Sequence, residues 1–541
     1  MTRPVDETAF STDVFGRFLC RTWNEAIGGG DPFDVVVLGA GTYGAYCAAE
    51  LVKAGRRVLL LDAGPVVLPE HIQNIGDLDL HIPRPDREPS GVWRVPWRGN
   101  EKSPGLAYCA GGRSIFFGGW LARLTAEDLS EWPKEVAADL EAGYPLLERA
   151  TGVEPAWDLV DGRLHKTLLA MVRTAAGQTP NLDAHTVQTA PLAVQAAPPE
   201  SGLLSFDKFS TVPVLAAAVR AYGKMLLNFV PRATVLRLWH GGGVVRAIDV
   251  ALPSRRERLH IPPSCRVVLA LGAVESTRLA LNSFPTPLMG RNLMIHVRSD
   301  LITRVHRSAL PGLAEPHIDV ATILARGRAD SGRFHLQITA STGSGSRIDE
   351  PLFQMVPDLD QLERIREQVD PDWVTVVVRT VGETHGDREA PAGSPGGNWI
   401  TVDPAWPDEF GVPTAYVNLR LRPEDLRTWD AMDTAAVGLL RALVPDPEKI
   451  RYWYDGRWRR TPFPVGAGGL LEWRNWLGYT HHEAGLMWMG EDPATSVTDS
   501  VGRFHHLRNA YACDGSIFPT VGSVGPVLTG LTLARRLATR L

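Results

Sequence analysis

One stretch near the N-terminus limits the possible folds more than any other part of the chain. Residues 33–65 read FDVVVLGAGTYGAYCAAELVKAGRRVLLLDAGP. An apolar run of buried-strand length is followed by GxGxxG, an alanine-rich helical pattern and a second apolar run that ends at Asp62. Strand, glycine turn, helix and strand in this order predict a βαβ unit in a parallel sheet that binds a dinucleotide.

The glycines of this motif have separate physical tasks. Gly39 permits the tight turn, Gly41 lets a pyrophosphate approach the backbone, and Gly44 lets helix and strand pack closely. The free N–H groups of the helix N-terminus favour phosphate at the same place. Asp62 follows the first glycine at about the 20-residue spacing expected for an acid that accepts ribose hydroxyls. The motif by itself does not separate FAD from NAD.

Length and composition exclude several classes of protein. A chain of 541 residues suggests two or more domains, and a net charge of −5 without a basic run argues against binding to nucleic acid or a membrane surface. The first residues do not resemble a secretory signal, and no run of about 18 apolar residues predicts a membrane span. Five scattered cysteines without CxxC spacing favour a reducing compartment over disulfides or a metal site. We therefore expect a cytoplasmic protein.

Further segments extend the fold prediction. Residues 11–27 indicate a short amphipathic helix. Two glycine pairs within residues 105–124 bracket a hydrophobic hairpin or turn, and clustered glycines often let backbone approach a flat ligand. Residues 265–284 combine a buried strand, a glycine turn and a helix, as expected where an open α/β sheet binds ligands. The C-terminus predicts a strand that ends at Asp514 and an amphipathic last helix, which would return to the first domain.

The region from about 306 to 476 has a different character. It alternates polar and apolar residues and is dense in Trp, Pro and Asp. Runs such as WVTVVVRT and TAYVNLRLR predict antiparallel strands with one solvated face, and helical patterns over 358–369 and 423–443 would pack on that sheet. The fold class we predict is α/β (α+β overall), with a Rossmann-like domain and an inserted domain built on an antiparallel sheet with helices.

Four ordered segments resemble the glucose–methanol–choline (GMC) oxidoreductases, and among them the pyranose oxidase-like branch. They are GAGTYG…LLLDAGP, GGRSIFFGGW, VVLALGAVESTRLAL…GRNLMIH and HHEAGLMWMG…DGSIFPTVGSVGPVLTG. The resemblance implies a flavoprotein that binds FAD and oxidises a hydroxyl group (a CH–OH donor) of a sugar, aminosugar or related polyol or natural product. The segment 301–480 matches only loosely, and substrate choice is expected to lie there.

The resemblance also divides the chain. It implies an FAD-binding domain in three parts, 1–150, 206–300 and 481–541, with a substrate or cap segment at 151–205 and a substrate-binding domain at 301–480. The residues implied in FAD binding lie in the two glycine motifs, at the adenine position, in the third strand–turn–helix segment and at the C-terminus. They are Gly39, Gly41, Thr42, Tyr43, Gly44, Asp62, Ala63, Gly111, Gly112, Ser114, Gly118, Val235, Gly272, Asp514, Gly515, Pro526 and Val527.

A pair of histidines near the C-terminus matches the catalytic motif of these enzymes. Family members often carry a base histidine in HxxGT, and aligning HHEAGLMWMG places His482 there, with His481 as a second candidate. Alcohol oxidation sends a hydride to flavin N5 while the hydroxyl loses a proton, and a neutral imidazole suits that proton. The other histidines, His296, His505 and His506, are predicted to be structural.

Three positions depart from the family pattern. The family usually supplies Asn or His just before the last helix, where this chain has Gly525, so a partner of the substrate hydroxyl is missing. We count Gly525 among the catalytic positions for this reason, and water or His481 could replace the contact. Leu486 replaces the threonine of HxxGT. Relatives with covalent flavin attach it at the position of Phe116, which implies noncovalent FAD here.

Two alternatives stay open at this stage. Gly525 is compatible with a non-oxidative, lyase- or decarboxylase-like relative that keeps FAD, and with a catalytically impaired flavin-binding protein. The expected partner is a small hydroxylated substrate, and the motifs do not separate oxygen from another electron acceptor. Four acids suggest a cationic substrate such as an aminosugar; they are Asp349, Glu350, Glu383 and Glu483.

Overall fold

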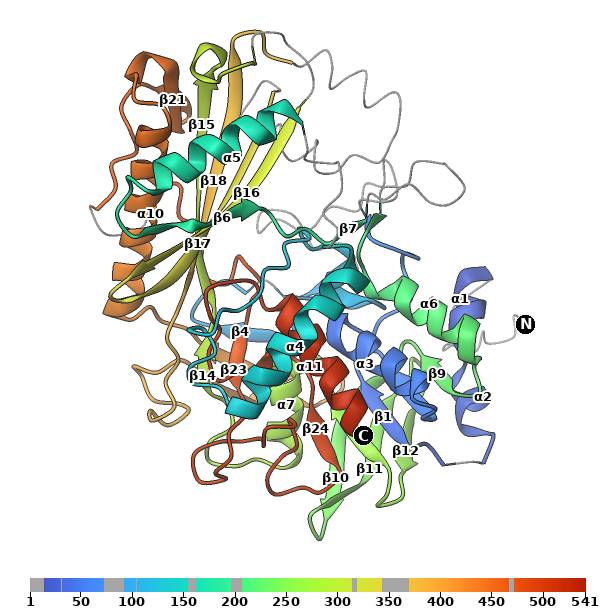
Figure 1. Ribbon diagram of the computed structural model, residues 1–541. Helices are drawn as coiled ribbons and strands as arrows, with labels where there is room; N and C mark the ends of the chain where they lie inside the picture. The colour runs from blue at the N-terminus through green and yellow to red at the C-terminus, as the bar shows by residue number, and fades with distance from the viewer. Residues whose placement is uncertain are drawn as a thin grey trace.

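The computed structural model describes residues 14–30, 32–72, 92–103, 105–153, 162–195, 207–313, 319–342, 369–466 and 471–541. Figure 1 shows two lobes. The lower lobe contains a sheet wrapped by helices, including the last helix of the chain, and the upper lobe contains a larger sheet with helices along one side. The two lobes meet near the ends of the large-sheet strands.

The lower lobe is organised around a parallel sheet of five short strands. Its order is β24-β13-β1-β2-β9, and every neighbouring pair is parallel. The central strands are fully buried apolar runs, as expected for a parallel sheet covered on both faces. The strand bounds are β1 Val35–Leu38, β2 Val58–Leu61, β9 Leu227–Val230, β13 Arg266–Leu269 and β24 Ala510–Ala512.

Helices from distant parts of the chain cover this sheet. The alanine-rich α3, predicted after the glycine motif, contacts both α6 and the C-terminal α11, and α11 also contacts α4. Small residues make these contacts close, because a Cβ at Gly530 in α11 would lie 2.2 Å from the ring of Tyr43 in α3. The helix bounds are α3 Thr42–Lys53, α4 Lys134–Thr151, α6 Thr211–Tyr222, α7 Ala273–Ser283 and α11 Val527–Arg540.

The upper lobe is built on a seven-stranded antiparallel sheet. Its order is β22-β21-β15-β18-β17-β16-β6. Helices α10 and α5 pack on one face of this sheet and form a second hydrophobic core with it (Figure 1). The bounds are β6 Leu182–Thr189, β15 His296–His306, β16 Val320–Ala329, β17 Gly332–Ser341, β18 Trp373–Glu383, β21 Ile450–Tyr454, β22 Arg457–Arg459, α5 Arg163–Ala176 and α10 Pro423–Leu443.

Smaller elements connect the two lobes or lie at their edges. The two-stranded pair β14–β23 matters most for function, because β14 leads directly into β15 of the upper sheet. The remaining bounds are α1 Val14–Leu19, α2 Trp23–Ile27, β3 Trp93–Arg94, β4 Trp97–Gly99, β5 Leu106–Ala107, η2 Gly112–Ile115, β7 Val194–Gln195, β8 Asp207–Lys208, β10 Thr234–Gly241, β11 Val244–Ala251, β12 Arg256–His260, β14 Arg291–Met294, η4 Arg307–Ala309, β19 Trp399–Pro407, β20 Pro413–Asn418, η5 Pro447–Lys449, β23 Ala484–Leu486 and η6 Gly515–Ile517.

Several local predictions need correction. The single helix expected at 11–27 is two short helices within its described part, because the chain breaks at 20–22 and Thr22 caps α2 in a capping box. The run in β18 does not have one solvated face. All but two of its residues are buried, since it is central in the sheet and polar side chains of its second face, such as Arg379, bond to neighbouring strands. The helix expected at 358–369 falls almost entirely outside the described residues.

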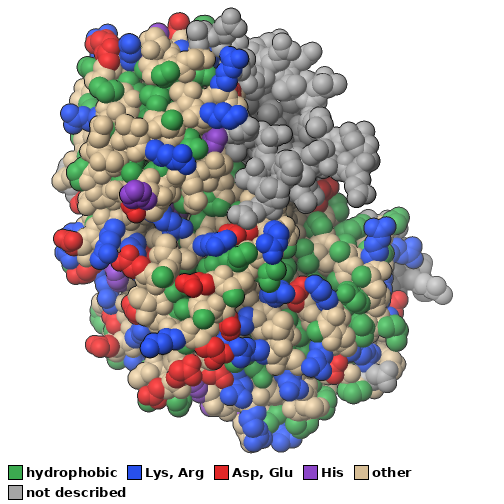
Figure 2. Space-filling model, in the orientation of Figure 1, with side chains coloured by type: hydrophobic (Ala, Val, Ile, Leu, Met, Phe, Trp, Pro, Cys, Tyr) green, Lys and Arg blue, Asp and Glu red, His purple; other side chains and the backbone are tan. Residues whose placement is uncertain are grey.

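The first five residues of the run TAYVNLRLR belong to β20, in a separate three-stranded sheet with β19 and β4 and not in the large sheet. Within the described ranges, no helix has both the length and the apolar character needed to cross a membrane. The described residues also contain no cluster of three or more metal-ligating side chains. Figure 2 shows basic and acidic side chains interspersed over the visible face.

Candidate active site

The glycine loop between β1 and α3 leaves one open position. Gly39 has φ +97°, and a Cβ there would lie 2.5 Å from the carbonyl oxygen of Ala270 in the neighbouring chain segment. A Cβ on Gly44 would lie 2.0 Å from the oxygen of Gly39. A Cβ on Gly41, in contrast, would meet nothing within 4 Å. Packing therefore requires the first and third glycines, while the second borders free space at the helix N-terminus.

Asp62 closes this loop from the end of β2. Its Oδ2 accepts the N–H of Ala40 at 2.7 Å, and its Oδ1 accepts the N–H of Gly64 at 2.8 Å. Burial raises the pKa of Asp62 to about 6, although these hydrogen bonds act in the opposite direction. The Asp62 carbonyl accepts the N–H of Ala233, so the segment that leads into β10 and Val235 runs beside the acid, next to Ala63.

The second glycine motif packs directly on the first. Gly111 donates its N–H to the oxygen of Ala40 at 2.7 Å, and a Cβ on Gly112 would lie 3.0 Å from the Cα of Gly41. The buried hydroxyl of Ser114 donates to the Gly111 carbonyl at 2.7 Å and lies 3.1 Å from the Thr211 hydroxyl at the start of α6. The two glycine motifs thus pack against each other, and the Ser114 hydroxyl has partners within the protein.

The other predicted cofactor residues lie mostly at the ends of strands and the starts of helices. Asp514, after β24, is buried and accepts hydrogen bonds from the N–H groups of Gly272 and Ser516 and from the hydroxyl of Ser276. Burial raises the pKa of Asp514. Pro526 and Val527 begin helix α11. Among the remaining members, Thr42 and Tyr43 begin α3, Gly515 begins η6, and Gly118 is exposed beyond η2.

The predicted base His482 lies against a second histidine. Its Nδ1 is 2.9 Å from the Nδ1 of His296, and the two rings stand nearly perpendicular, at 87°. The Nε2 of His296 is 2.9 Å from the carbonyl oxygen of Gly522. His296 is buried, whereas His482 keeps part of its surface exposed. The imidazole of His296 therefore connects the backbone of residue 522 to the imidazole of the predicted base.

The histidines of this site are held in their neutral form. Burial lowers the pKa of His296 to about 4. The loss of water around the ring, followed by the neighbouring His296, lowers the pKa of His482 well below 6.5. Burial also lowers the pKa of His335 to about 3, and this residue donates Nδ1–H to the carbonyl of Ser523 at 2.6 Å. An uncharged imidazole is the form that can accept a proton.

The turn before α11 is fixed from both lobes. His296 and His335, both from the large sheet, hold the carbonyls of Gly522 and Ser523. From the lower lobe, buried Asp128 accepts the backbone N–H of Ser523 at 3.0 Å and its hydroxyl at 3.1 Å. These contacts determine where Gly525 lies.

Gly525 faces the predicted base. A Cβ at this position would lie 3.2 Å from Cε1 and 3.4 Å from Nε2 of His482. Among the described residues, Nε2 of His482 has no hydrogen-bond partner. The structure thus brings the two predicted catalytic positions together, and the missing side chain of Gly525 leaves room in front of the free nitrogen.

His481 has a separate environment. Its backbone is in the left-handed region, with φ +58°, which costs energy for a residue other than glycine. Its carbonyl accepts a hydrogen bond from Arg113 Nη1 at 2.9 Å, and its ring packs beside Trp93. Burial lowers the pKa of His481 to about 3. Its Nδ1 is buried without a partner in the part of the chain that the structure describes.

Arg113 and Glu483 form an ion pair between the second glycine motif and the histidine segment. Arg113 donates from Nη1 to Glu483 Oε2 at 2.6 Å and from Nη2 to Oε1 at 3.1 Å, a two-pronged geometry that fixes both side chains. The Nε of Arg113 is a second buried polar atom without a partner among the described residues. Glu483 was suggested as a ligand for a cationic substrate, and its charge is already neutralised by Arg113.

The other suggested acids do not join this site as free charges. Glu383 forms an ion pair with Arg333, with Nε–Oε1 at 2.8 Å. Asp349 and Glu350 lie outside the described residues. His505 bonds to the Ser496 hydroxyl at 2.8 Å, and His506 packs beside Phe284, so both are in structural positions.

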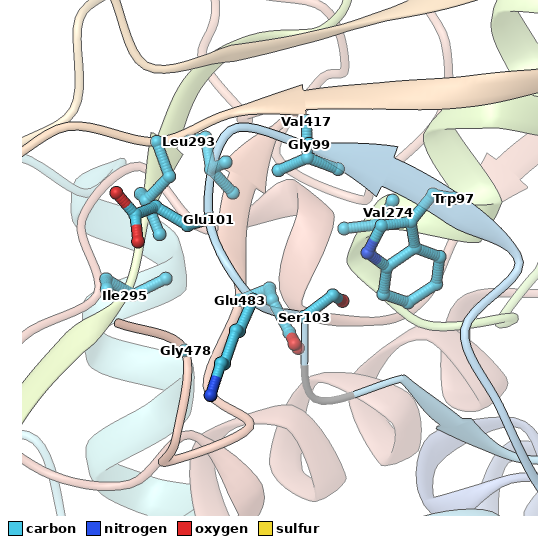
Figure 3. Close-up of a pocket in the computed structure, with 12 residues that line it drawn as sticks. Trp97, Gly99, Glu101, Ser103, Val274, Leu293, Ile295, Val417, Gly478 and Glu483 are labelled. Atoms are coloured by element: carbon cyan, nitrogen blue, oxygen red, sulfur yellow. The ribbon is translucent and has the colours of Figure 1, made fainter. Parts of the chain in front are cut away.

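A small apolar cavity borders Glu483 (Figure 3). Its volume is about 30 Å³, far below the roughly 300–1,000 Å³ of sites for drug-sized ligands. The histidines do not line it. Its walls include Trp97, Val274, Leu293, Ile295 and Glu483.

Sequence reasoning missed three residues of this site. His296 was assigned a structural role, and His335 and Arg113 were not singled out. The strand pairing contains the signal that would have found His296. Met294 in β14 pairs with Ala484 in the antiparallel strand β23, and extending this register by two residues places His296 opposite His482. The pairing of β14 with β23 was not predicted, so this register could not be used.

Comparison with known proteins identifies related oxidoreductases. Residues 397–534 match the family model of the GMC oxidoreductases. Paromamine 6'-oxidase of Streptomyces fradiae is 26% identical over 546 residues, covering 92% of this chain and 89% of that protein. The 6'''-hydroxyparomomycin C oxidase of Streptomyces lividus is 26% identical over 544 residues, with the same coverage. The resemblance to the GMC oxidoreductases inferred from the motifs is thereby confirmed.

The fold is also found among solved structures. The crystal structure of pyridoxine 4-oxidase from Mesorbium loti matches with a TM-score of 0.57 and 17% sequence identity, covering 94% of this chain and 99% of that chain. The predicted fold class, a Rossmann-like domain combined with an antiparallel substrate-domain sheet, is confirmed.

Proposed function

Because the chain carries the GMC oxidoreductase domain, we propose that it is an FAD-dependent enzyme that oxidises a hydroxyl group of a sugar, an aminosugar or a related polyol. Two relatives are named oxidases of paromamine and of 6'''-hydroxyparomomycin C, and they align along nine-tenths of the chain. The observation that carries the proposal is the neutral His482 ring, whose free Nε2 faces the space left by Gly525.

The described residues fit FAD at the two glycine motifs. The open side of Gly41 offers the close backbone approach that a pyrophosphate needs, at the positive end of α3. Asp62 retains oxygen lone pairs for ribose hydroxyls beside its two backbone contacts. The unpartnered polar atoms of Arg113 and His481 lie in the same region and would gain partners from a polar ligand.

The proposal includes noncovalent attachment of FAD, which the side chain at residue 116 supports. Phe116 has no nucleophilic atom, and its ring is buried against Trp93 with 5.4 Å between the ring centres. Denaturation followed by filtration should therefore release all flavin from the protein. Flavin that stays with the denatured chain would contradict this part of the proposal.

In the proposed reaction, His482 removes the proton of the substrate hydroxyl. Nε2 of His482 takes the hydroxyl proton, while Nδ1–H stays bonded toward His296. Bound FAD would accept the hydride from the same carbon, so the CH–OH group becomes a carbonyl and two electrons leave the substrate. The low pKa of His482 keeps the base uncharged and ready throughout the neutral pH range.

The first experiment follows the flavin absorption of the purified protein without oxygen while sugars, aminosugars and simple alcohols are added. We expect one class to bleach the flavin bands. His482→Ala should retain FAD and slow this bleaching by roughly 10²-fold or more. His505→Ala, which removes a histidine whose ring bonds to the Ser496 hydroxyl and has no described contact with His482, should not slow it.

Two outcomes contradict this proposal. Flavin that no alcohol reduces would favour the non-oxidative, lyase-like reading suggested by Gly525, or a flavin-binding protein without this activity. Unchanged reduction in His482→Ala would mean that another group removes the proton. Where an alcohol does reduce the flavin, reoxidation of the reduced enzyme by oxygen or by artificial acceptors separates an oxidase from a dehydrogenase.

A further inference from the structure

The hydrogen-bond chain at the site has a direction that fixes the proton positions. The carbonyl of Gly522 can only accept, so His296 must carry its proton on Nε2. His296 is buried, and burial lowers its pKa to about 4, so its Nδ1 is an unprotonated acceptor. The 2.9 Å contact then requires His482 to donate from Nδ1–H. The free nitrogen of His482, Nε2, is left with a lone pair.

The backbone around His296 fixes the position of its ring against His482. The β14–β23 pairing sets residue 296 opposite residue 482, and the Thr480 hydroxyl donates to the carbonyl of His296 at 3.3 Å. The carbonyl of Gly522 is itself fixed, because the next residue is bonded to Asp128 and His335. The acceptor that faces His482 is therefore held at both ends.

We propose that His296 is a positioning residue that holds His482 in the Nδ1–H tautomer and in one ring orientation, so that Nε2 is available to the substrate. This rests on the proposed role of His482 as base. When His482 takes a proton, its Nδ1–H becomes a charged donor and its bond to His296 strengthens, which favours proton removal from the substrate. With the opposite tautomer, Nε2 would carry a proton and could not act as base.

Two substitutions test the hydrogen bonds of the two ring nitrogens of His296 separately. In His296→Asn, the amide oxygen lies near the former Nδ1 and can accept from His482, but the bond to Gly522 is lost. In His296→Gln, the amide nitrogen lies near the former Nε2 and can donate to Gly522, but the acceptor for His482 is lost. We expect His296→Gln to slow flavin reduction roughly 10²-fold and His296→Asn to retain most of the rate.

His165→Asn is the matched control, because it removes another buried histidine of the upper lobe, bonded to the Thr189 hydroxyl. It should retain the full rate. Equal loss in His296→Asn and His296→Gln, or no loss in His296→Gln, would overturn the proposal.

A second measurement does not depend on turnover. In the FAD-bound enzyme labelled with ¹⁵N-histidine, NMR distinguishes protonated from unprotonated ring nitrogens, and the His482 signals are assigned by their loss in His482→Gln. We expect His482 to carry its proton on Nδ1, and to lose this fixed state in His296→Gln but not in His296→Asn. A proton on Nε2 of His482 would overturn the proposal. Because this test needs no substrate, it can fail or succeed independently of the proposed oxidation.

Discussion

The two halves of this site are built in different ways. The glycine half comes from one continuous segment, in which β1, the loop and α3 follow one another and a single glycine, Gly41, borders open space. The histidine half is assembled from distant parts of the chain, since His296 meets a residue 186 positions away and a carbonyl 226 positions away. The first glycine loop is thus a local property of the chain, whereas placement of the predicted base depends on how the two lobes meet.

The largest effect is expected from substitutions in the glycine half of the site. Gly44→Ala would place a Cβ 2.0 Å from the Gly39 oxygen, so we expect loss of folded, flavin-containing protein. Gly41→Ala is its matched partner, because a Cβ there meets nothing within 4 Å. That variant should fold with wild-type stability without FAD and bind FAD more weakly. Flavin content and thermal unfolding of the FAD-free protein measure both. Equal FAD affinity in Gly41→Ala would show that no ligand approaches this glycine.

The next effect tests the link between the halves. Arg113→Ala leaves Glu483 with an uncompensated, mostly buried charge, and we expect a loss of roughly 3 kcal/mol in the free energy of unfolding. Adding Glu483→Gln should recover part of this loss, since the buried charge is then removed. Urea unfolding of the two variants measures it. Equal stability of Arg113→Ala and the wild type would mean that the ion pair does not connect the halves energetically.

The third effect concerns acid stability of the assembled half. A neutral, buried histidine has a folded pKa below its unfolded value of about 6.5, so the unfolded chain binds more protons as the pH falls. The contribution of such a histidine to the free energy of unfolding is fully present above pH 6.5. It is lost progressively as the pH falls toward the pKa of the folded state, which is about 3 for His335. Acidification from pH 7 to pH 5 therefore lowers the free energy of unfolding by up to about 2 kcal/mol for each such residue.

His335→Asn tests this sign, because an amide can still donate to Ser523 but does not titrate. Urea unfolding at both pH values should show a smaller loss on acidification in the variant. Asp62, whose pKa is raised to about 6, acts in the opposite direction, but it is present in both proteins and cancels from the comparison. A larger acid loss in the variant would contradict the prediction.

The smallest effect is expected from substitutions at residue 525, beside the predicted base. A side chain at residue 525 would press on His482, whose ring cannot retreat because His296 holds its Nδ1. We expect Gly525→Ala and Gly525→Asn to slow anaerobic flavin reduction about tenfold, although Asn restores the group found in relatives. Faster reduction in Gly525→Asn would show instead that the missing hydrogen bond limits the reaction.

How far the sequence predicts this molecule follows the same division. The strand–glycine–helix–strand order of residues 33–65 and the C-terminal helix are found as expected, because both depend on neighbours in the chain. The seven-stranded sheet was predicted only as a type, since strand pairing between β15 and β18 is not encoded in either strand alone. His482 was named through a motif. His296 lies in no recognised catalytic motif, and its role depends on a register that only the folded chain reveals.

The short ladder of β14 with β23 also limits how such enzymes can be recombined. Only Ile295 separates β14 from β15, the strand that brings His296 from the large sheet, and β23 begins two residues after His482. An exchange of upper lobes between related enzymes would therefore also exchange the residue that contacts His482. If His296 positions the base as proposed, laboratory chimeras aimed at a new substrate need to keep the first residue of β15 while changing the rest of that sheet.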